Sequence, residues 1–102
     1  MVAKRLREAR VAAGLSQREL GVRAGMDPSV ASPRINQYER AKHLPDPQTL
    51  ERLGAVLGRP LPFFYAADED LAFLITAFHH ARAAQRRQWL ADVRRGIERA
   101  NK

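Results

Sequence analysis

The chain begins with apolar residues spaced three or four positions apart, which is the period of an amphipathic helix. These positions predict a helix over residues 2–13 that ends at Gly14, because glycine readily adopts the backbone conformation that stops a helix. The apolar stripe of this predicted helix consists of Val2, Leu6, Ala9 and Ala13.

The capping residues of the next segment predict a second helix that starts after Ser16. Ser16 and Glu19 stand three positions apart, so each side chain can accept a hydrogen bond from the backbone N–H of the other. Leu15 can pack against Leu20 as a hydrophobic staple. Gly25 supplies a positive φ that ends the helix sharply, so a third helix follows in a new direction.

Two sequence signals compete for the start of the third helix. The Ser32-Pro33 pair is typical of a helix start, because proline at the first helical position loses no hydrogen bond. A start at Pro28 would instead place Pro33 inside the helix and kink it. We therefore expect the third helix over residues 33–40. Residues 26–31 before it are expected to form a turn or a single helical turn begun by Asp27.

The Asp46-Pro47 pair repeats this start signal and predicts a fourth helix that ends at Gly58. Prolines within residues 59–62 predict a rigid connector, and the aromatic residues 63–65 are expected to pack beneath the bundle. The inward positions of the fourth helix are Leu50, Leu53, Val56 and Leu57.

Two further apolar stripes follow in residues 68–100. Three acidic residues at 68–70 predict a helix start, where the helix dipole favours negative charge. One continuous helix would bring Arg82 and Arg86 onto its apolar face, so two helices that meet near residues 81–84 fit the pattern better. The first stripe contains Leu71, Leu74, Ile75 and Phe78, and the second, which we expect to face inward, contains Trp89, Leu90, Val93 and Ile97.

The charge distribution points to a class of partner. The chain has 18 Lys and Arg against 11 Asp and Glu, which gives a net charge of +7. Residues 1–25 and 81–102 are basic, whereas residues 51–80 contain two basic and four acidic residues. Two basic regions favour a polyanionic partner, although solvated arginine-rich helices would give the same composition.

Several function classes lack the residues that their chemistry needs. The sequence has no cysteine, which excludes disulfides, thiol catalysis and thiolate metal sites. His79 and His80 are adjacent and would point about 100° apart on a helix, so they do not form a metal site. We expect no enzymatic activity, metal or cofactor. No segment reaches the roughly 20 apolar residues of a membrane span, so we expect a cytoplasmic protein with no membrane partner.

Three motifs stand out in the first half of the chain: Gly14-Leu15-Ser16-Gln17-x-Glu19-Leu20, Ala24-Gly25 and Ile35-x-x-Tyr38-Glu39. Together they resemble the phage repressor/Cro-type helix-turn-helix domains of the xenobiotic-response-element family. The resemblance covers about residues 4–65. It implies an all-α, five-helix DNA-binding bundle over residues 1–66, followed by one or two C-terminal helices over residues 67–102. Residues 26–30 look like an insertion of about four residues relative to this family.

The third helix is the element that such a domain places in the DNA major groove. With Ile35 and Tyr38 facing the core, a turn of 100° per residue points Asn36 and Gln37 outward. Gln37 can pair with adenine, and Arg34 can pair with guanine or contact a phosphate. The expected base-reading residues are Gln37, Arg34, Asn36 and Ser32, and the expected phosphate contacts are Arg18, Arg40, Lys42, His43 and, by the resemblance, Gln17.

The resemblance also implies an ion pair between Arg10 and Glu39. These residues would join the first helix to the third. Their expected role is therefore structural, because the pair would hold the reading helix in place.

A short helix reads few bases, so we expect a homodimer that binds a palindromic site in double-stranded DNA. Residues 68–100 are the expected dimer element, unless their helices fold back onto the bundle of the same chain. The alternative is an antitoxin-like regulator whose C-terminal helices bind a partner protein. RNA binding is a weaker third interpretation, because the chain has only seven aromatic residues for stacking on single strands.

Overall fold

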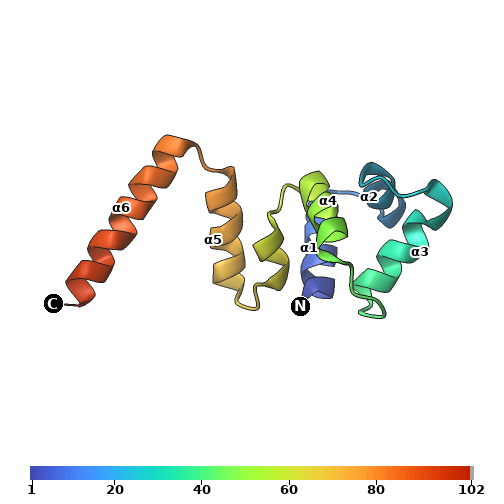
Figure 1. Cartoon of the computed structure of the whole chain (residues 1–102), viewed down its shortest axis with the longest axis horizontal. Helices are drawn as coiled ribbons and strands as arrows, with labels where there is room; N and C mark the ends of the chain where they lie inside the picture. Colours follow the sequence, from blue (N-terminus) through green and yellow to red (C-terminus); the bar gives the residue numbers. More distant parts are fainter. Residues whose placement is uncertain (102) are drawn as a thin grey trace.

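The computed structural model describes residues 1–101, and this part of the chain contains helices and no strand, which confirms the predicted all-α class (Figure 1). In chain order, the elements are α1 (Val2–Ala12), α2 (Gln17–Arg23), α3 (Pro28–Glu39), α4 (Pro47–Leu57), the 3-10 helix η1 (Leu61–Tyr65), α5 (Glu69–His80) and α6 (Ala83–Ala100).

The elements from α1 to η1 pack around one apolar core. The predicted stripe of α1 is buried except for Ala13, which follows the helix and is exposed. The aromatic segment behaves as expected at Phe63 and Phe64, which are buried, but Tyr65 is 51% exposed. Burial of each large apolar side chain contributes about 1.5–3 kcal/mol to folding. The fully buried apolar residues include Leu6, Leu20, Ile35, Leu50, Leu53 and Phe64.

The helix-turn-helix unit of α2 and α3 has the predicted caps and turn. Ser16 and Glu19 form the capping box at the start of α2. Gly25 has a φ of +94°, which confirms the sharp end of α2. The two helices approach closely, because a Cβ added to Gly21 would lie 2.6 Å from the Cβ of Ala31. A side chain at Gly21 would therefore push α3 away from α2.

The prediction that the third helix begins at residue 33 is wrong. α3 begins at Pro28, with Asp27 as its N-cap, and Pro33 lies inside the helix. Ala31 is fully buried and lies against Gly21, so the chain must already be helical before Pro33. This packing outweighs the one backbone hydrogen bond that proline cannot donate.

The same finding changes the structure expected for residues 26–30. Residues 28–30 form the first turn of α3, so only residues 24–27 connect the two helices. The side chain of Asp27 accepts hydrogen bonds from the backbone N–H of Ser29 at 2.9 Å and from its hydroxyl at 2.6 Å. The link between α2 and α3 is therefore tight, and α3 is about one turn longer than the sequence pattern suggested.

The helices α5 and α6 form an extension that we call the C-terminal arm. The predicted break is confirmed, because α5 ends at His80 and α6 begins at Ala83. The molecule is elongated, at 58 × 26 × 22 Å, because α6 points away from the bundle (Figure 1). Ala72 is buried and Ile75 packs against the core, and both attach α5 to the bundle.

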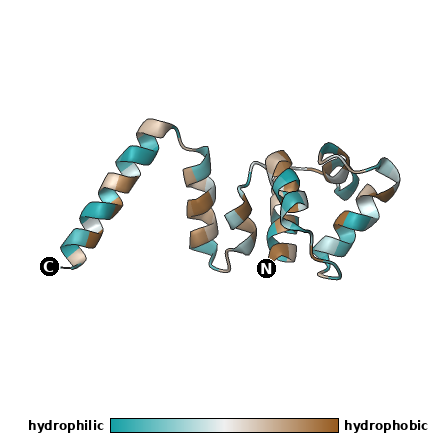
Figure 2. Ribbon diagram, in the orientation of Figure 1, coloured by the Kyte–Doolittle hydropathy of each residue, from teal (hydrophilic) through white to brown (hydrophobic). Residues whose placement is uncertain are grey.

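The expectation that the apolar stripe of α6 faces inward is wrong. No residue from Ala83 to Ala100 is buried, because only α5 of the same chain lies beside this helix. Figure 2 shows apolar residues along α5 and, between hydrophilic ones, along α6. In α6 the exposed apolar residues are Trp89 (37%), Leu90 (39%), Val93 (57%) and Ile97 (55%).

Candidate nucleic-acid interface and C-terminal groove

One face of α3 is open to solvent along the length of the helix. Ala31 and Ile35 are buried on the inner face, whereas Ser29, Pro33 and Gln37 are exposed at intervals of about one turn. A helix with its side chains is roughly 10–12 Å across, which matches the roughly 12 Å width of the DNA major groove. The exposed face therefore has the dimensions of a DNA-reading element.

The four expected base-reading residues have different environments. Gln37 and Arg34 are exposed, and Arg34 borders a hollow that also contacts Arg52 of α4. Ser32 and Asn36 are half-buried. Gln37 and Arg34 are thus the two most accessible of the four.

Two of the expected DNA contacts are hydrogen-bonded to each other. The side-chain nitrogen of Gln17, at the start of α2, donates to Asn36 Oδ1 and to Glu39 Oε1, both at 3.3 Å. Gln17 therefore bridges α2 and the C-terminal half of α3. In this arrangement Gln17 and Asn36 help to fix the position of α3. Only the polar atoms that these bonds leave free could form hydrogen bonds with DNA.

Arg10 and Glu39 are brought together between α1 and α3. Arg10 Nε and Nη2 donate to the two carboxylate oxygens of Glu39 at 2.6 and 3.0 Å, and Nη1 donates to the carbonyl oxygen of Leu15 at 2.9 Å. The side chains are only 15% and 3% exposed. The hydrogen bonds that Arg10 donates to Glu39 raise the pKa of Arg10. Arg10 thus ties α3 both to α1 and to the segment before α2.

The expected phosphate contacts surround this face of α3. Arg18 is exposed in the first turn of α2, and Arg40, Lys42 and His43 are exposed directly after α3. The backbone N–H of Lys42 donates to the carbonyl oxygen of Gln37 at 2.9 Å, which folds this segment back against the end of the helix. Positive side chains thus lie at the C-terminal end of the exposed face of α3, where a DNA backbone would pass if this face lay in the major groove.

The sequence analysis weighed a start at Pro28 and rejected it, so the first turn of α3 was left out of the expected DNA contacts. Ser29 and Val30 are exposed there and extend the exposed face of α3 towards its N-terminal end. The signal was present, because Asp27-Pro28 is the same type of cap-and-proline pair as Asp46-Pro47. The sequence could not show the contact between Gly21 and Ala31, which favours a helix start at Asp27-Pro28 over one at Ser32-Pro33.

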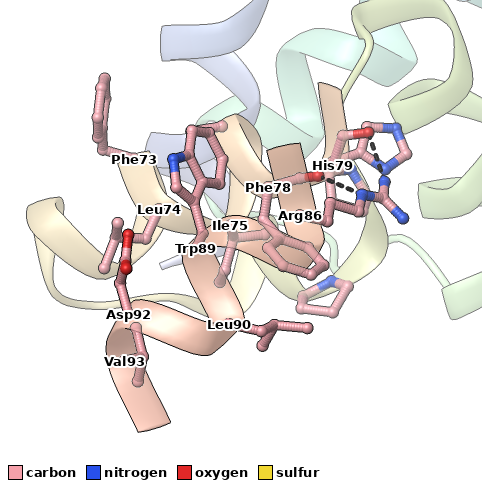
Figure 3. Close-up of a pocket in the computed structure, with 13 residues that line it drawn as sticks. Phe73, Leu74, Ile75, Phe78, His79, Arg86, Trp89, Leu90, Asp92 and Val93 are labelled. Carbon is pink, nitrogen blue, oxygen red and sulfur yellow. Dashed lines mark hydrogen bonds between the residues drawn. The ribbon is translucent and has the colours of Figure 1, made fainter. Parts of the chain in front are cut away.

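A second candidate site is an apolar groove between α5 and α6 (Figure 3). The groove has a volume of about 790 Å³. Arg86 of α6 joins the two helices at one end of the groove, because Nε and Nη2 donate to the carbonyl oxygens of Phe78 and His79 at 2.8 Å each. Its apolar lining includes Phe73, Leu74 and Phe78 of α5 and Trp89, Leu90 and Val93 of α6.

Residues 1–101 contain no group of three His, Asp or Glu side chains placed to hold a metal ion. Within the same residues, no helix has the length and apolar character needed to span a bilayer.

Comparison with known proteins adds two findings. A family profile described as a helix-turn-helix domain matches residues 2–62. A crystal structure of the transcriptional regulator BswR superimposes with a TM-score of 0.86 and 37% sequence identity, covering 93% of this chain and 94% of the other. No curated protein matches the sequence. The second match includes the C-terminal arm, so the likeness to BswR is not confined to the helix-turn-helix unit.

Proposed function

Because the chain belongs to the helix-turn-helix domain family, we propose that it is a DNA-binding transcriptional regulator that reads an operator through α3. The observation that carries the proposal is the exposed face of α3, which the Arg10–Glu39 pair holds against α1. The likeness to BswR over nearly the whole chain supports a regulatory role. The xenobiotic-response-element type is the subfamily that the sequence motifs favour.

In this proposal, affinity and selectivity come from different residues. Arg18, Arg40 and Lys42 supply affinity by neutralising backbone phosphates, which does not depend on base sequence. Gln37 and Arg34 supply selectivity, because their side chains can form two hydrogen bonds with a purine edge. Asn36 and Ser32, which are half-buried, add shorter-range contacts.

We propose further that two copies bind together through the C-terminal arm. One α3 covers about half of a typical operator, and a symmetric dimer doubles the contacts. The arm exposes Phe73 (72%) and Leu74 (61%) in addition to the stripe of α6, which is costly unless another surface covers them. Charge supports self-association: α5 begins with acidic residues 68–70, whereas α6 carries five arginines and two acidic residues.

The proposed division of the chain is a DNA-binding part over residues 1–66 and a self-association part over residues 67–102. The antitoxin-like alternative uses the same arm to bind a partner protein, and no feature of residues 1–101 favours it over a second copy. The proposed role requires no catalysis and no cofactor. It also requires access to chromosomal DNA, in keeping with the cytoplasmic location expected from the sequence.

The proposal is tested by comparing Gln37→Ala with Lys42→Ala on cognate and scrambled DNA. Lys42→Ala should weaken binding to both about equally and lower the slope of log affinity against log salt by roughly one. Gln37→Ala should lose about 1–3 kcal/mol on cognate DNA and relax the preference at one base pair. Equal losses for Gln37→Ala on both DNAs would remove Gln37 from the reading residues.

A further inference from the structure

Arg5 of α1 is the one charged side chain that is fully buried in residues 1–101. It lies between the DNA-binding part and the start of the C-terminal arm. Nε donates to the carbonyl oxygen of Ala66 at 2.8 Å, Nη2 to that of Ala67 at 3.3 Å, and Nη1 to Glu69 Oε2 at 3.0 Å. All three acceptors belong to the segment that leads from η1 into α5.

Neighbouring groups complete this arrangement, which we call the Arg5 latch. Glu8 accepts a second hydrogen bond from Arg5 Nη1 at 3.1 Å, and Lys4 donates to Glu69 Oε1 at 2.7 Å. The guanidinium also lies 5.9 Å from the centre of the Phe63 ring. A buried arginine with this many partners restricts the start of α5 far more than apolar packing of Ala72 alone would.

The latch is one of three arginine contacts that connect the reading helix to the arm. Arg10 joins α1 to α3, Arg5 joins α1 to α5, and Arg86 joins α6 to the end of α5. Arg5 and Arg10 both belong to α1. This helix is therefore a rigid connection between the element that faces DNA and the element that faces the second copy.

We propose that the Arg5 latch sets the direction in which the C-terminal arm leaves the DNA-binding part, and so determines the spacing of the two half-sites that a dimer reads. The inference rests on the proposed function, in which α3 reads DNA and the arm joins two copies. Arg5 and Glu69 are positioning residues in this scheme, because neither lies on the exposed face of α3.

The dimensions of the arm make its direction matter. α6 has 18 residues and is therefore about 27 Å long. A tilt of the whole arm by about 10° at the Arg5 latch displaces one end of α6 relative to the other by about 5 Å, which exceeds the 3.4 Å rise of one base pair. The other end of α5 is held by one hydrogen bond, between His80 Nε2 and the carbonyl oxygen of Gly58 at 2.7 Å. The His80 side chain is exposed. The buried latch is thus the stronger constraint.

The experiment uses the full chain and a panel of inverted repeats whose spacer changes by one base pair at a time. Affinity for each repeat is compared with affinity for an isolated half-site. The first variant is Arg5→Met, which removes all the hydrogen bonds that Arg5 donates. The second is Glu69→Ala, which removes the carboxylate acceptor; the Glu69 side chain is 62% exposed, so this variant leaves no cavity in the core. Arg7→Met, at an exposed arginine of the same helix, is the matched control.

We expect the wild-type protein to prefer one spacer by about tenfold over spacers two base pairs longer or shorter. In Arg5→Met and Glu69→Ala this preference should fall to less than about threefold, while half-site affinity stays within about twofold. The Arg7→Met control should keep the wild-type preference. A loss of spacer preference without a loss of half-site affinity would not result from a general loss of structure.

The outcomes separate the two proposals. A wild-type protein without any spacer preference would contradict the dimeric function and the inference with it. A wild-type preference that both variants retain, or variants that lose half-site affinity but keep the preference, would overturn the latch alone. If Arg5→Met does not fold, Glu69→Ala decides the question by itself.

Discussion

Phe64 in η1 and Phe73 in α5 are close in sequence but lie in opposite environments. Phe64 is fully buried in the core, whereas Phe73 is 72% exposed on the C-terminal arm. The same contrast holds between the stripes of α4 and α6, since Leu50 is fully buried and Val93 is 57% exposed. A helical period of apolar residues thus identifies a surface that is expected to be buried. The period does not indicate whether this surface is buried by the same chain or by another molecule.

The sharpest test of this contrast is a matched pair of phenylalanine truncations. Phe64→Ala should lower the free energy of unfolding by about 3–5 kcal/mol, because it leaves a cavity in the core. Phe73→Ala should cost less than about 0.5 kcal/mol when measured on the monomer. Urea unfolding at low protein concentration measures both. Similar losses for the two variants would mean that the arm is part of the core.

The contacts that hold α3 to α1 should be nearly as sensitive. Arg10→Ala should cost about 3–5 kcal/mol, because it leaves the buried carboxylate of Glu39 without its charged partner. The control is Lys4→Ala, which breaks an ion pair with Glu69 whose side chains are 61% and 62% exposed. The control should cost less than about 1 kcal/mol. A loss below about 1 kcal/mol for Arg10→Ala would show that the pair does not anchor the reading helix.

On the arm, truncation should affect association and leave the stability of the monomer nearly unchanged. Trp89→Ala removes an aromatic residue of the apolar groove and should raise the dimer dissociation constant by about thirtyfold, which corresponds to about 2 kcal/mol. Gln88→Ala, at the exposed neighbouring position, is the control. Analytical ultracentrifugation over a concentration series measures both constants. A wild-type chain that stays monomeric at all concentrations would contradict self-association.

The smallest expected effect is a pH dependence at the junction of the two regions. Hydrogen bonds from Arg5 and Lys4 lower the pKa of Glu69 from 4.5 to about 2. A carboxylate whose pKa is depressed in the folded state stabilises that state above its unfolded pKa, and the contribution is lost as the pH falls. The stability difference between wild type and Glu69→Gln should therefore be constant above about pH 5 and disappear between pH 4.5 and 2.

Because both proteins share every other titrating group, the difference isolates Glu69. A difference that persists unchanged at pH 2 would show that the carboxylate charge does not contribute to the Arg5 latch.

Local signals in the sequence were enough for much of the fold. The capping box at Ser16, the glycine turns at Gly25 and Gly58 and the loss of phase near residues 81–84 each predict a feature that is confirmed. Each of these signals acts over a few residues, so no knowledge of distant contacts is required.

Features that depend on distant contacts could not be predicted in this way. The start of α3 depends on the fit of Ala31 against Gly21, which only the packed structure reveals. Arg5 stands beside the apolar stripe of α1, three positions after Val2 and four before Ala9. Two of its partners are backbone carbonyls more than sixty positions away, which no local signal indicates. The exposure of Gln37 follows from helical phase, whereas the bond between Gln17 and Asn36 does not.

A dimeric regulator should recognise an inverted repeat. The decisive experiment is selection from random duplex DNA with the purified full chain, at near-physiological salt to suppress non-specific binding. We expect enrichment of an inverted repeat with a single preferred spacing. Binding without any enriched sequence, removed by modest increases in salt, would show that the basic surface binds DNA only through its charge and would contradict the proposed function.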